Sequence, residues 1–115
     1  MFDFENLKVY QRAREIRKKI FSVLAKERLI DKLIIDQLKR AIISVILNVA
    51  EGTGKSSRLD KKRFFATARG SIYEVVAIID ILSDDGFISK EEKATLYSDL
   101  EVTSKMLAGL INSVK

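Results

Sequence analysis

The chain has 115 residues, of which 47% are hydrophobic, and it contains no proline, five glycines, no cysteine and no histidine. This length suits one domain over residues 1–115, the apolar content argues against disorder, and the shortage of turn residues argues against an all-β fold. The missing cysteine and histidine exclude disulfides and the commonest metal ligand and general base, while the net charge of +5 (21 basic minus 16 acidic) makes an anionic partner plausible.

Targeting and membrane segments are not visible in the sequence. The N-terminus has no basic region followed by an apolar stretch, so no signal peptide is expected. The most apolar segment runs from Ala41 to Ala50 and is bracketed by Arg40 and Glu51. A membrane crossing needs about twenty apolar residues. We therefore expect a soluble protein of the cytoplasm that makes no contact with a membrane.

Helical periodicity begins near the N-terminus. The first helix is expected roughly from Phe4 to Lys26, because apolar residues recur there every three or four positions. The second is expected roughly from Asp31 to Glu51. The segment Gly52-Thr53-Gly54 follows it, and we expect this glycine pair to end the helix with left-handed backbone.

Two further helices complete the chain. The third is expected to start near Ser57 or Leu59 and to stop at Asp84-Asp85-Gly86. The fourth opens at Ser89, which forms a capping-box pattern with Glu92, and continues to Val114. Breaks this short force each helix to run antiparallel to its predecessor. The predicted fold is all-α, an antiparallel up-down-up-down four-helix bundle.

The second helix is apolar on more than one side. On a helical wheel, one core stripe consists of Leu38, Ala41, Ile42, Val45 and Val49. Well outside that stripe lie Ile35, Ile43, Ile46, Leu47 and Ala50. Neighbouring helices and loops could cover this wide apolar surface. We favour burial against another copy of the chain, a homo-oligomer, because apolar patches of this size rarely stay exposed.

Polar residues of the second helix share one arc of about 80° on the same wheel. This polar ribbon consists of Gln37, Arg40, Ser44, Asn48 and Glu51. The third helix adds an i, i+4 pair, Gly70 and Glu74, with Ser71 beside them. The ribbon is interpreted as a hydrogen-bonded network that fixes register between helices or subunits, with a ligand site as the alternative.

Catalytic and metal-dependent chemistry find little support. Gly54-Lys55-Ser56 resembles the end of a phosphate-binding loop, but Val49 stands where the motif needs glycine, and a helix rather than a strand precedes it. Glu51 and Glu74 could suggest a di-metal carboxylate bundle, which needs histidine as well. We expect no enzyme, no cofactor and no metal.

Two basic clusters could bind an anionic partner. The first helix places five cations on one arc of about 120° opposite the core stripe: Lys8, Arg12, Lys18, Lys19 and Lys26. Only Glu15 opposes them, which gives +4 (five basic minus one acidic). The second cluster lies at the start of the third helix: Lys55, Arg58, Lys61, Lys62 and Arg63. Both could be ordinary solvated surface, or both could bind nucleic-acid phosphates without sequence specificity.

Several linked blocks carry a family resemblance. They are Gln37-Leu38-Lys39-Arg40-Ala41, Ser44, Asn48-Val49-Ala50-Glu51-Gly52, Phe64, Ala68-Arg69-Gly70-Ser71 and Glu74, with Phe4-Glu5-Asn6-Leu7-Lys8-Val9-Tyr10 and Gly86-Phe87-Ile88 at either side. With these blocks, nearly the whole chain resembles the 23S ribosomal RNA intervening-sequence proteins, also called the four-helix bundle protein family or, by an older label, the S23 ribosomal protein family.

The resemblance implies a bacterial antiparallel four-helix bundle that forms a ring-like homopentamer, in a family without an established molecular role. The family is also similar to the accessory protein of diversity-generating retroelements, which associates with a reverse transcriptase and nucleic acid. Many members carry a proline between the serine and the asparagine of the second-helix motif. This chain has Val45-Ile46-Leu47 there, so the kink that proline would cause is not expected.

Three functional hypotheses follow. The first is a symmetric oligomer whose basic surface engages RNA, DNA or a nucleoprotein. The second is a protein–protein scaffold or accessory subunit without direct nucleic-acid contact, in which the positive charge is incidental. The third and least favoured is an enzyme or small-ligand binder that uses Arg40, Asn48, Glu51 and Glu74.

Overall fold

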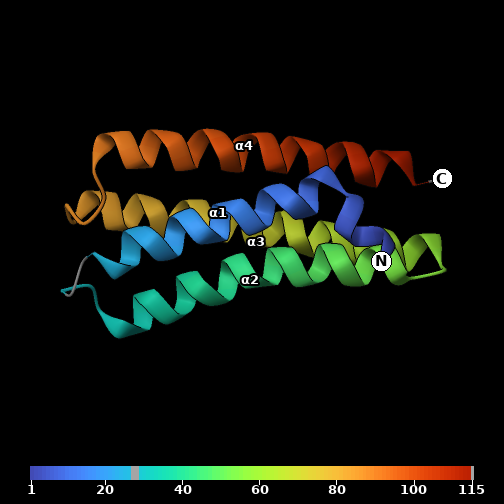
Figure 1. The fold of residues 1–115 in the computed structure, drawn as a ribbon, viewed down its shortest axis with the longest axis horizontal. Helices are drawn as coiled ribbons and strands as arrows, with labels where there is room; N and C mark the ends of the chain where they lie inside the picture. The colour runs from blue at the N-terminus through green and yellow to red at the C-terminus, as the bar shows by residue number, and fades with distance from the viewer. Residues whose placement is uncertain (27–28, 115) are drawn as a thin grey trace.

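The structure is a computed structural model that describes residues 1–26 and 29–114. A short 3₁₀ helix, η1 (Asp3–Asn6), precedes four α-helices: α1 (Lys8–Ala25), α2 (Lys32–Gly54), α3 (Arg58–Asp84) and α4 (Lys90–Ser113). The described residues contain no strand. Figure 1 shows that each long helix runs opposite to the one before it. The predicted all-α four-helix bundle is confirmed.

The four helices are packed as a closed ring of neighbours. Among the described residues, α1 packs against α2 and α4, α3 packs against the same two helices, and the backbones of α1 and α3 lie diagonally across the bundle. Two ion pairs fix the register of α1 on α4: Lys19 with Asp99 at 2.6 Å, and Lys26 with Glu92 at 3.8 Å. Lys26 is seven residues after Lys19, whereas Glu92 is seven residues before Asp99, so α1 and α4 run antiparallel.

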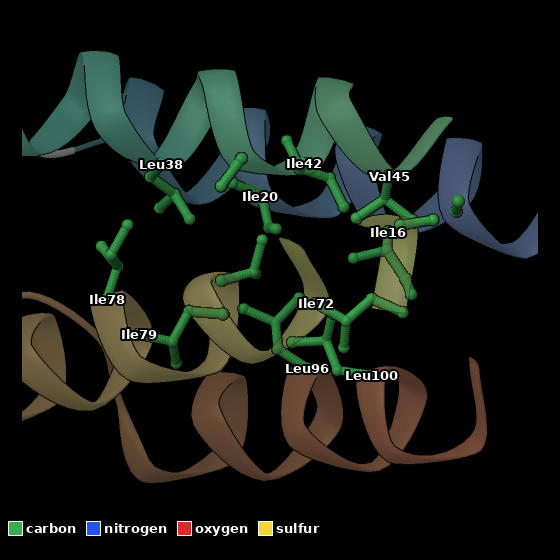
Figure 2. Close-up of a cluster of buried hydrophobic side chains, with 14 of the residues drawn as sticks. Ile16, Ile20, Leu38, Ile42, Val45, Ile72, Ile78, Ile79, Leu96 and Leu100 are labelled. Carbon is green, nitrogen blue, oxygen red and sulfur yellow. The ribbon is translucent and has the colours of Figure 1, made fainter. Parts of the chain in front are cut away.

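The core is built from the apolar stripes that the sequence predicts. Buried aliphatic side chains from all four helices meet between them, as Figure 2 shows for Ile20, Ile42, Ile72 and Leu100. Thr103 is the one fully buried polar side chain in the described part of the chain. Its hydroxyl donates a hydrogen bond to the backbone oxygen of Asp99 at 2.7 Å. The bond satisfies a polar group that would otherwise be costly to bury.

The first helix begins later than expected. Leu7 has extended backbone (φ −73°, ψ 127°), so η1 and α1 are separate elements instead of one helix from Phe4. The η1 turn closes on itself, because the Glu5 carboxylate accepts a hydrogen bond from the Phe2 amide at 2.9 Å. The Phe4 ring lies 4.9 Å from the Tyr10 ring, which holds the turn against α1.

The end of α2 contradicts the sequence prediction. The helix passes through Gly52 and Gly54, and neither glycine has a positive φ. Gly52 has a packing role instead, because a Cβ atom there would lie 2.7 Å from Cε1 of Phe65 and 3.0 Å from Cβ of Phe64. The glycine is therefore needed for the close approach of α2 to α3, a use of the missing side chain that differs from a turn.

The left-handed cap appears at the end of α3. Gly86 has a φ of 78°, and the amide of Phe87 donates to the backbone oxygen of Leu82 at 2.9 Å. The amide of Gly86 donates to the backbone oxygen of Ser83 at 3.1 Å. These two bonds make a Schellman motif. The predicted stop at Gly86 is confirmed.

The capping box of α4 is also confirmed. Ser89 Oγ accepts from the Glu92 amide at 3.0 Å, and Glu92 Oε1 accepts from the Ser89 amide at 3.0 Å. The hydrogen bond from the Ser89 amide is the main cause that lowers the pKa of Glu92 below 4.5, and the nearby charge of Lys26 lowers it further. Glu92 thus serves two contacts, the cap of its own helix and the ion pair to α1.

The sequence predicts no membrane-spanning segment. None of the helices within residues 1–26 and 29–114 is both long enough and apolar enough to cross a bilayer.

Candidate functional site

Part of the predicted polar ribbon is a hydrogen-bonded seam between α2 and α3. Gln37 Nε2 donates to Glu74 Oε2 at 2.6 Å, and the hydroxyls of Ser44 and Ser71 lie 2.9 Å apart. Asn48 Nδ2 donates to the backbone oxygen and to the hydroxyl of Ser44, at 2.8 and 3.0 Å. We call these five residues the α2–α3 seam. The interpretation of the ribbon as a network that fixes register stays a prediction.

Three predicted members lie outside the seam. Arg40 and Glu51 are exposed on the outer side of α2, and neither forms an ion pair within the described residues. Gly70 is exposed on α3, and no atom lies within 4 Å of the position that a Cβ would take. The structure therefore divides the ribbon into a paired seam and a separate outer surface.

The seam gives a direct test of its structural role. Ser44→Ala and Ser71→Ala should each lower the free energy of unfolding by about 1 kcal/mol, because Ser44→Ala removes the partner of the half-buried Ser71 hydroxyl and Ser71→Ala removes one of the two side-chain partners of the Ser44 hydroxyl. The double variant should lose less than the sum, since no unpaired hydroxyl remains. Urea unfolding of the three variants measures this coupling. Ser98→Ala, at an exposed serine of α4, is the control, and additive losses would contradict a structural seam.

The outer surface of α2 retains part of its predicted apolar character. Ile35 and Ile46 pack against the core, so they do not need a partner. Ala50 is half-buried. Ile43 and Leu47 remain 38% and 53% exposed in the single chain. Among the five residues that the wheel places outside the core stripe, the exposed apolar surface is therefore narrower than predicted and is centred on Ile43 and Leu47.

Ion pairs reduce the charge of the cluster on α1. Lys18 pairs with Glu15 at 3.6 Å, and α4 supplies Asp99 to Lys19 and Glu92 to Lys26. The wheel included only Glu15, because it could not include carboxylates from another helix. Counting all three carboxylates, this surface carries +2 (five basic minus three acidic) in place of +4.

The cluster at the turn between α2 and α3 keeps its charge. We call it the turn cluster: Lys55, Arg58, Lys61, Lys62 and Arg63. Only Arg63 has a carboxylate partner in the described chain, Asp60 at 3.9 Å, so the cluster carries +4 (five basic minus one acidic). Lys61 is occupied structurally, because its ammonium donates to the backbone oxygen of Thr53 at 2.8 Å. The Lys55 ammonium lies 4.9 Å from the centre of the Phe64 ring.

A groove of about 410 Å³ between α3 and α4 was not predicted from the sequence. Its floor includes Ile72 and Leu100, and Tyr73 and Tyr97, which are 60% and 48% exposed, line it. A second groove of about 470 Å³ lies between α1 and α4. Neither groove is lined by a residue of the α2–α3 seam. The wheel of α3 could have indicated the first groove, since Tyr73 falls well outside the core stripe.

Metal binding and catalysis gain no support from the arrangement of acidic side chains. Within the described residues, no group of three or more acidic side chains is placed to hold a metal ion. Glu51 is exposed on the outer side of α2, whereas Glu74 is bonded to Gln37 in the seam. The carboxylate pair that the sequence suggested is therefore not assembled into one site.

Comparison with known proteins gives one clear result. The family model described as 23S rRNA-intervening sequence protein matches residues 5–109. The comparison with curated proteins finds no match. The family match covers all four helices of the bundle up to the last turn of α4, and it includes both the α2–α3 seam and the turn cluster. The chain therefore belongs to the 23S rRNA-intervening sequence protein family.

Proposed function

We propose that this chain is a non-enzymatic cytoplasmic protein that assembles with copies of itself and binds the phosphate backbone of RNA or DNA through the turn cluster. The observation that carries the proposal is the charge of that cluster, +4, in which only Arg63 has a carboxylate ion-pair partner among the described residues. Closely spaced cations release counterions from nucleic acid when they neutralise phosphates, and this requires no reading of bases. The family name makes RNA the first partner to test.

The charge distribution along the bundle supports one orientation for the nucleic acid. The region around the turn between α3 and α4 is acidic: Asp84, Asp85, Glu91 and Glu92 against Lys90 and Lys26, the ion-pair partner of Glu92, give −2 (two basic minus four acidic). Figure 1 shows this turn at the end of the molecule opposite to the turn cluster. The longest dimension is 45 Å, several times the screening length at physiological salt. A polyanion is attracted to one end and repelled from the other.

Self-association supports the same function. Ile43 and Leu47 are exposed in the single chain, and their burial against another copy is favourable. A symmetric oligomer repeats the turn cluster once per copy, and linked sites bind one nucleic acid far more tightly than a single site does. The resemblance of the sequence suggests five copies.

Two measurements on one sample test the proposal. Light scattering is expected to give a solution mass above 13.1 kDa, the mass of the single chain. Binding to a ribosomal RNA fragment is expected to weaken steeply as salt rises, with a linear relation between log affinity and log salt. RNA binding that ignores salt would contradict the backbone mechanism. A protein partner that stays bound after nuclease treatment, with no RNA affinity, would favour the scaffold function instead.

A further inference from the structure

Four residues form a stripe along the outer side of α2. Arg40, Ile43, Leu47 and Glu51 follow one another at intervals of three, four and four residues, which places them on one side of the helix. All four are exposed. The stripe begins with a cation, ends with an anion and has two apolar side chains between them. Arg40 and Glu51 are separated by about 16 Å along the helix, from eleven residues at 1.5 Å each.

A second stripe on α3 has the complementary order of residues. Asp80, Ala77, Tyr73 and Arg69 follow one another, counted backwards along the chain, at the same intervals of three, four and four. All four line the groove between α3 and α4. This stripe begins with an anion, ends with a cation and has a small and an aromatic side chain between them. When the two stripes are aligned antiparallel, Arg40 corresponds to Asp80 and Glu51 corresponds to Arg69.

The helix α4 repeats the same order of charge along the groove. Lys93 pairs with Asp80 at 3.4 Å, and this pair sets the antiparallel register of α4 on α3. In that register Glu101 lies toward the Asp80 end relative to Lys105, which lies near Arg69, and both line the groove. Asp80 and Glu101 therefore lie toward one end of the groove, where Lys93 compensates part of their charge, and Arg69 and Lys105 lie toward the other. This order of charges suits Arg40 and Glu51 of α2.

The α3 stripe contains a buried polar atom without a partner, and the α2 stripe contains exposed charges without an ion pair in the described chain. The Nε atom of Arg69 is buried and has no hydrogen-bond partner within the described residues, although another nitrogen of the same guanidinium lies 3.3 Å from the Tyr73 hydroxyl. On α2, Arg40 and Glu51 lack an ion-pair partner in the described chain. A buried donor without an acceptor is costly, and a carboxylate is the acceptor that suits a guanidinium best.

We infer that α2 of one copy lies in the α3–α4 groove of the next copy, with Arg40 against Asp80, Leu47 against Tyr73 and Glu51 against Arg69. This inference rests on the proposed self-association and specifies its surface. Helices α2 and α3 are antiparallel within each chain, so the pairing places neighbouring copies side by side in the same orientation.

The two surfaces that meet are different, and this has a consequence for symmetry. A contact between unlike surfaces is head-to-tail, and it generates a ring when the rotation between copies closes. In a closed ring, every copy has its α3–α4 groove occupied by α2 of a neighbour. A two-fold dimer, by contrast, would place α2 of one copy against α2 of the other and leave the α3–α4 groove empty.

Cysteine crosslinking separates these arrangements, because the natural chain has no cysteine. Leu47→Cys and Tyr73→Cys are placed in separate chains, mixed, and treated with a short bifunctional thiol crosslinker. The inference predicts covalent dimers in the mixture and few in either variant alone. A chain that carries both substitutions should give a ladder of covalent multimers. Ser98→Cys, at an exposed position of α4 outside both stripes, replaces either partner in the control mixture.

The outcomes distinguish the interface from the proposed function. Strong crosslinking of Leu47→Cys with itself, or none between the two variants in a sample of oligomeric mass, would overturn the interface and leave self-association standing. A single-chain mass for the natural protein would overturn both. Crosslinking confined to the mixed and doubly substituted samples supports the inference.

Charge exchange provides a second measurement. Glu51→Arg and Arg69→Glu should each raise the dissociation constant of assembly by at least about tenfold, because each places like charges together. The double variant should recover most of the loss, since the pair is restored with its signs exchanged. Circular dichroism confirms that each variant keeps its helices. Single variants that assemble normally, or a double variant no better than the singles, would overturn the proposed pairing.

Discussion

Replacing Gly52 by alanine is expected to lower the free energy of unfolding by about 1–3 kcal/mol, the usual cost of forcing an extra methyl group into a packed core. The new Cβ would lie 2.7 Å from Cε1 of Phe65 and 3.0 Å from Cβ of Phe64. The Phe65 ring is buried and cannot swing away freely, and the Phe64 Cβ is attached directly to the backbone of α3. Relief therefore requires α2 and α3 to separate locally.

Gly54→Ala is the matched control for this prediction. Gly54 also belongs to α2, has no positive φ and has no atom within 4 Å of its would-be Cβ. Alanine there should be neutral or stabilise by up to about 1 kcal/mol, because it restricts the unfolded chain. Urea unfolding of both variants gives the comparison. Equal effects at the two positions would contradict the role of Gly52 in the packing of α2 on α3.

Neutralising the turn cluster is expected to weaken RNA binding far more than neutralising the cluster on α1. The turn variant combines Lys55→Gln, Arg58→Gln, Lys62→Gln and Arg63→Gln. The matched variant combines Lys8→Gln, Arg12→Gln, Lys18→Gln and Lys19→Gln. Each removes four positive charges, so net charge is equal in the two variants. Lys61 is kept in both, because its bond to the Thr53 backbone oxygen supports the fold.

The reason for the difference is the ion pairs. Lys18 and Lys19 are already paired with Glu15 and Asp99, so they have less attraction left for a phosphate. Only Arg63 of the four turn cations has a carboxylate partner in the described chain. Glutamine replaces these cations without placing a new negative charge beside a carboxylate, which charge reversal at Lys18 or Lys19 would do.

The salt dependence measures how many phosphates are lost. Each phosphate contact contributes about 0.9 to the slope of log affinity against log salt for duplex DNA, and about 0.7 for a single strand. The turn variant should therefore reduce the slope by roughly 3 to 4 on duplex DNA if every one of the four cations makes one contact. Fluorescence anisotropy over a series of salt concentrations gives the slope. Equal losses in the two variants would indicate diffuse attraction by net charge, and unchanged binding in both would eliminate the turn cluster as the site.

Much of the fold follows from residues that are neighbours along the chain. The four-residue spacing of Ile16, Ile20 and Leu24 predicts a buried stripe, and the structure buries all three. The Ser89 and Glu92 capping box is local as well, because both of its hydrogen bonds join residues three positions apart. Such features depend on helix geometry and on hydrophobic burial, which one stretch of sequence displays completely.

Glycine shows where local reasoning is insufficient. The sequence predicts left-handed backbone for the pair Gly52 and Gly54, and only a helix stop at Gly86. The left-handed residue is Gly86, with a φ of 78°. Gly52 remains helical, because what it requires is the absence of a Cβ beside Phe65 on another helix.

The candidate site divides in the same way. The sequence by itself determined that α2 carries a polar ribbon and has apolar residues outside its core stripe. It also determined that two clusters of cations exist. Only the tertiary structure decided that Ser44 meets Ser71, and that Asp99 and Glu92 neutralise part of the α1 cluster. The physical reason is that periodicity describes one helix at a time. Hydrogen bonds, ion pairs and close packing between helices depend on the register and rotation of a second helix, which are set by how all four pack together.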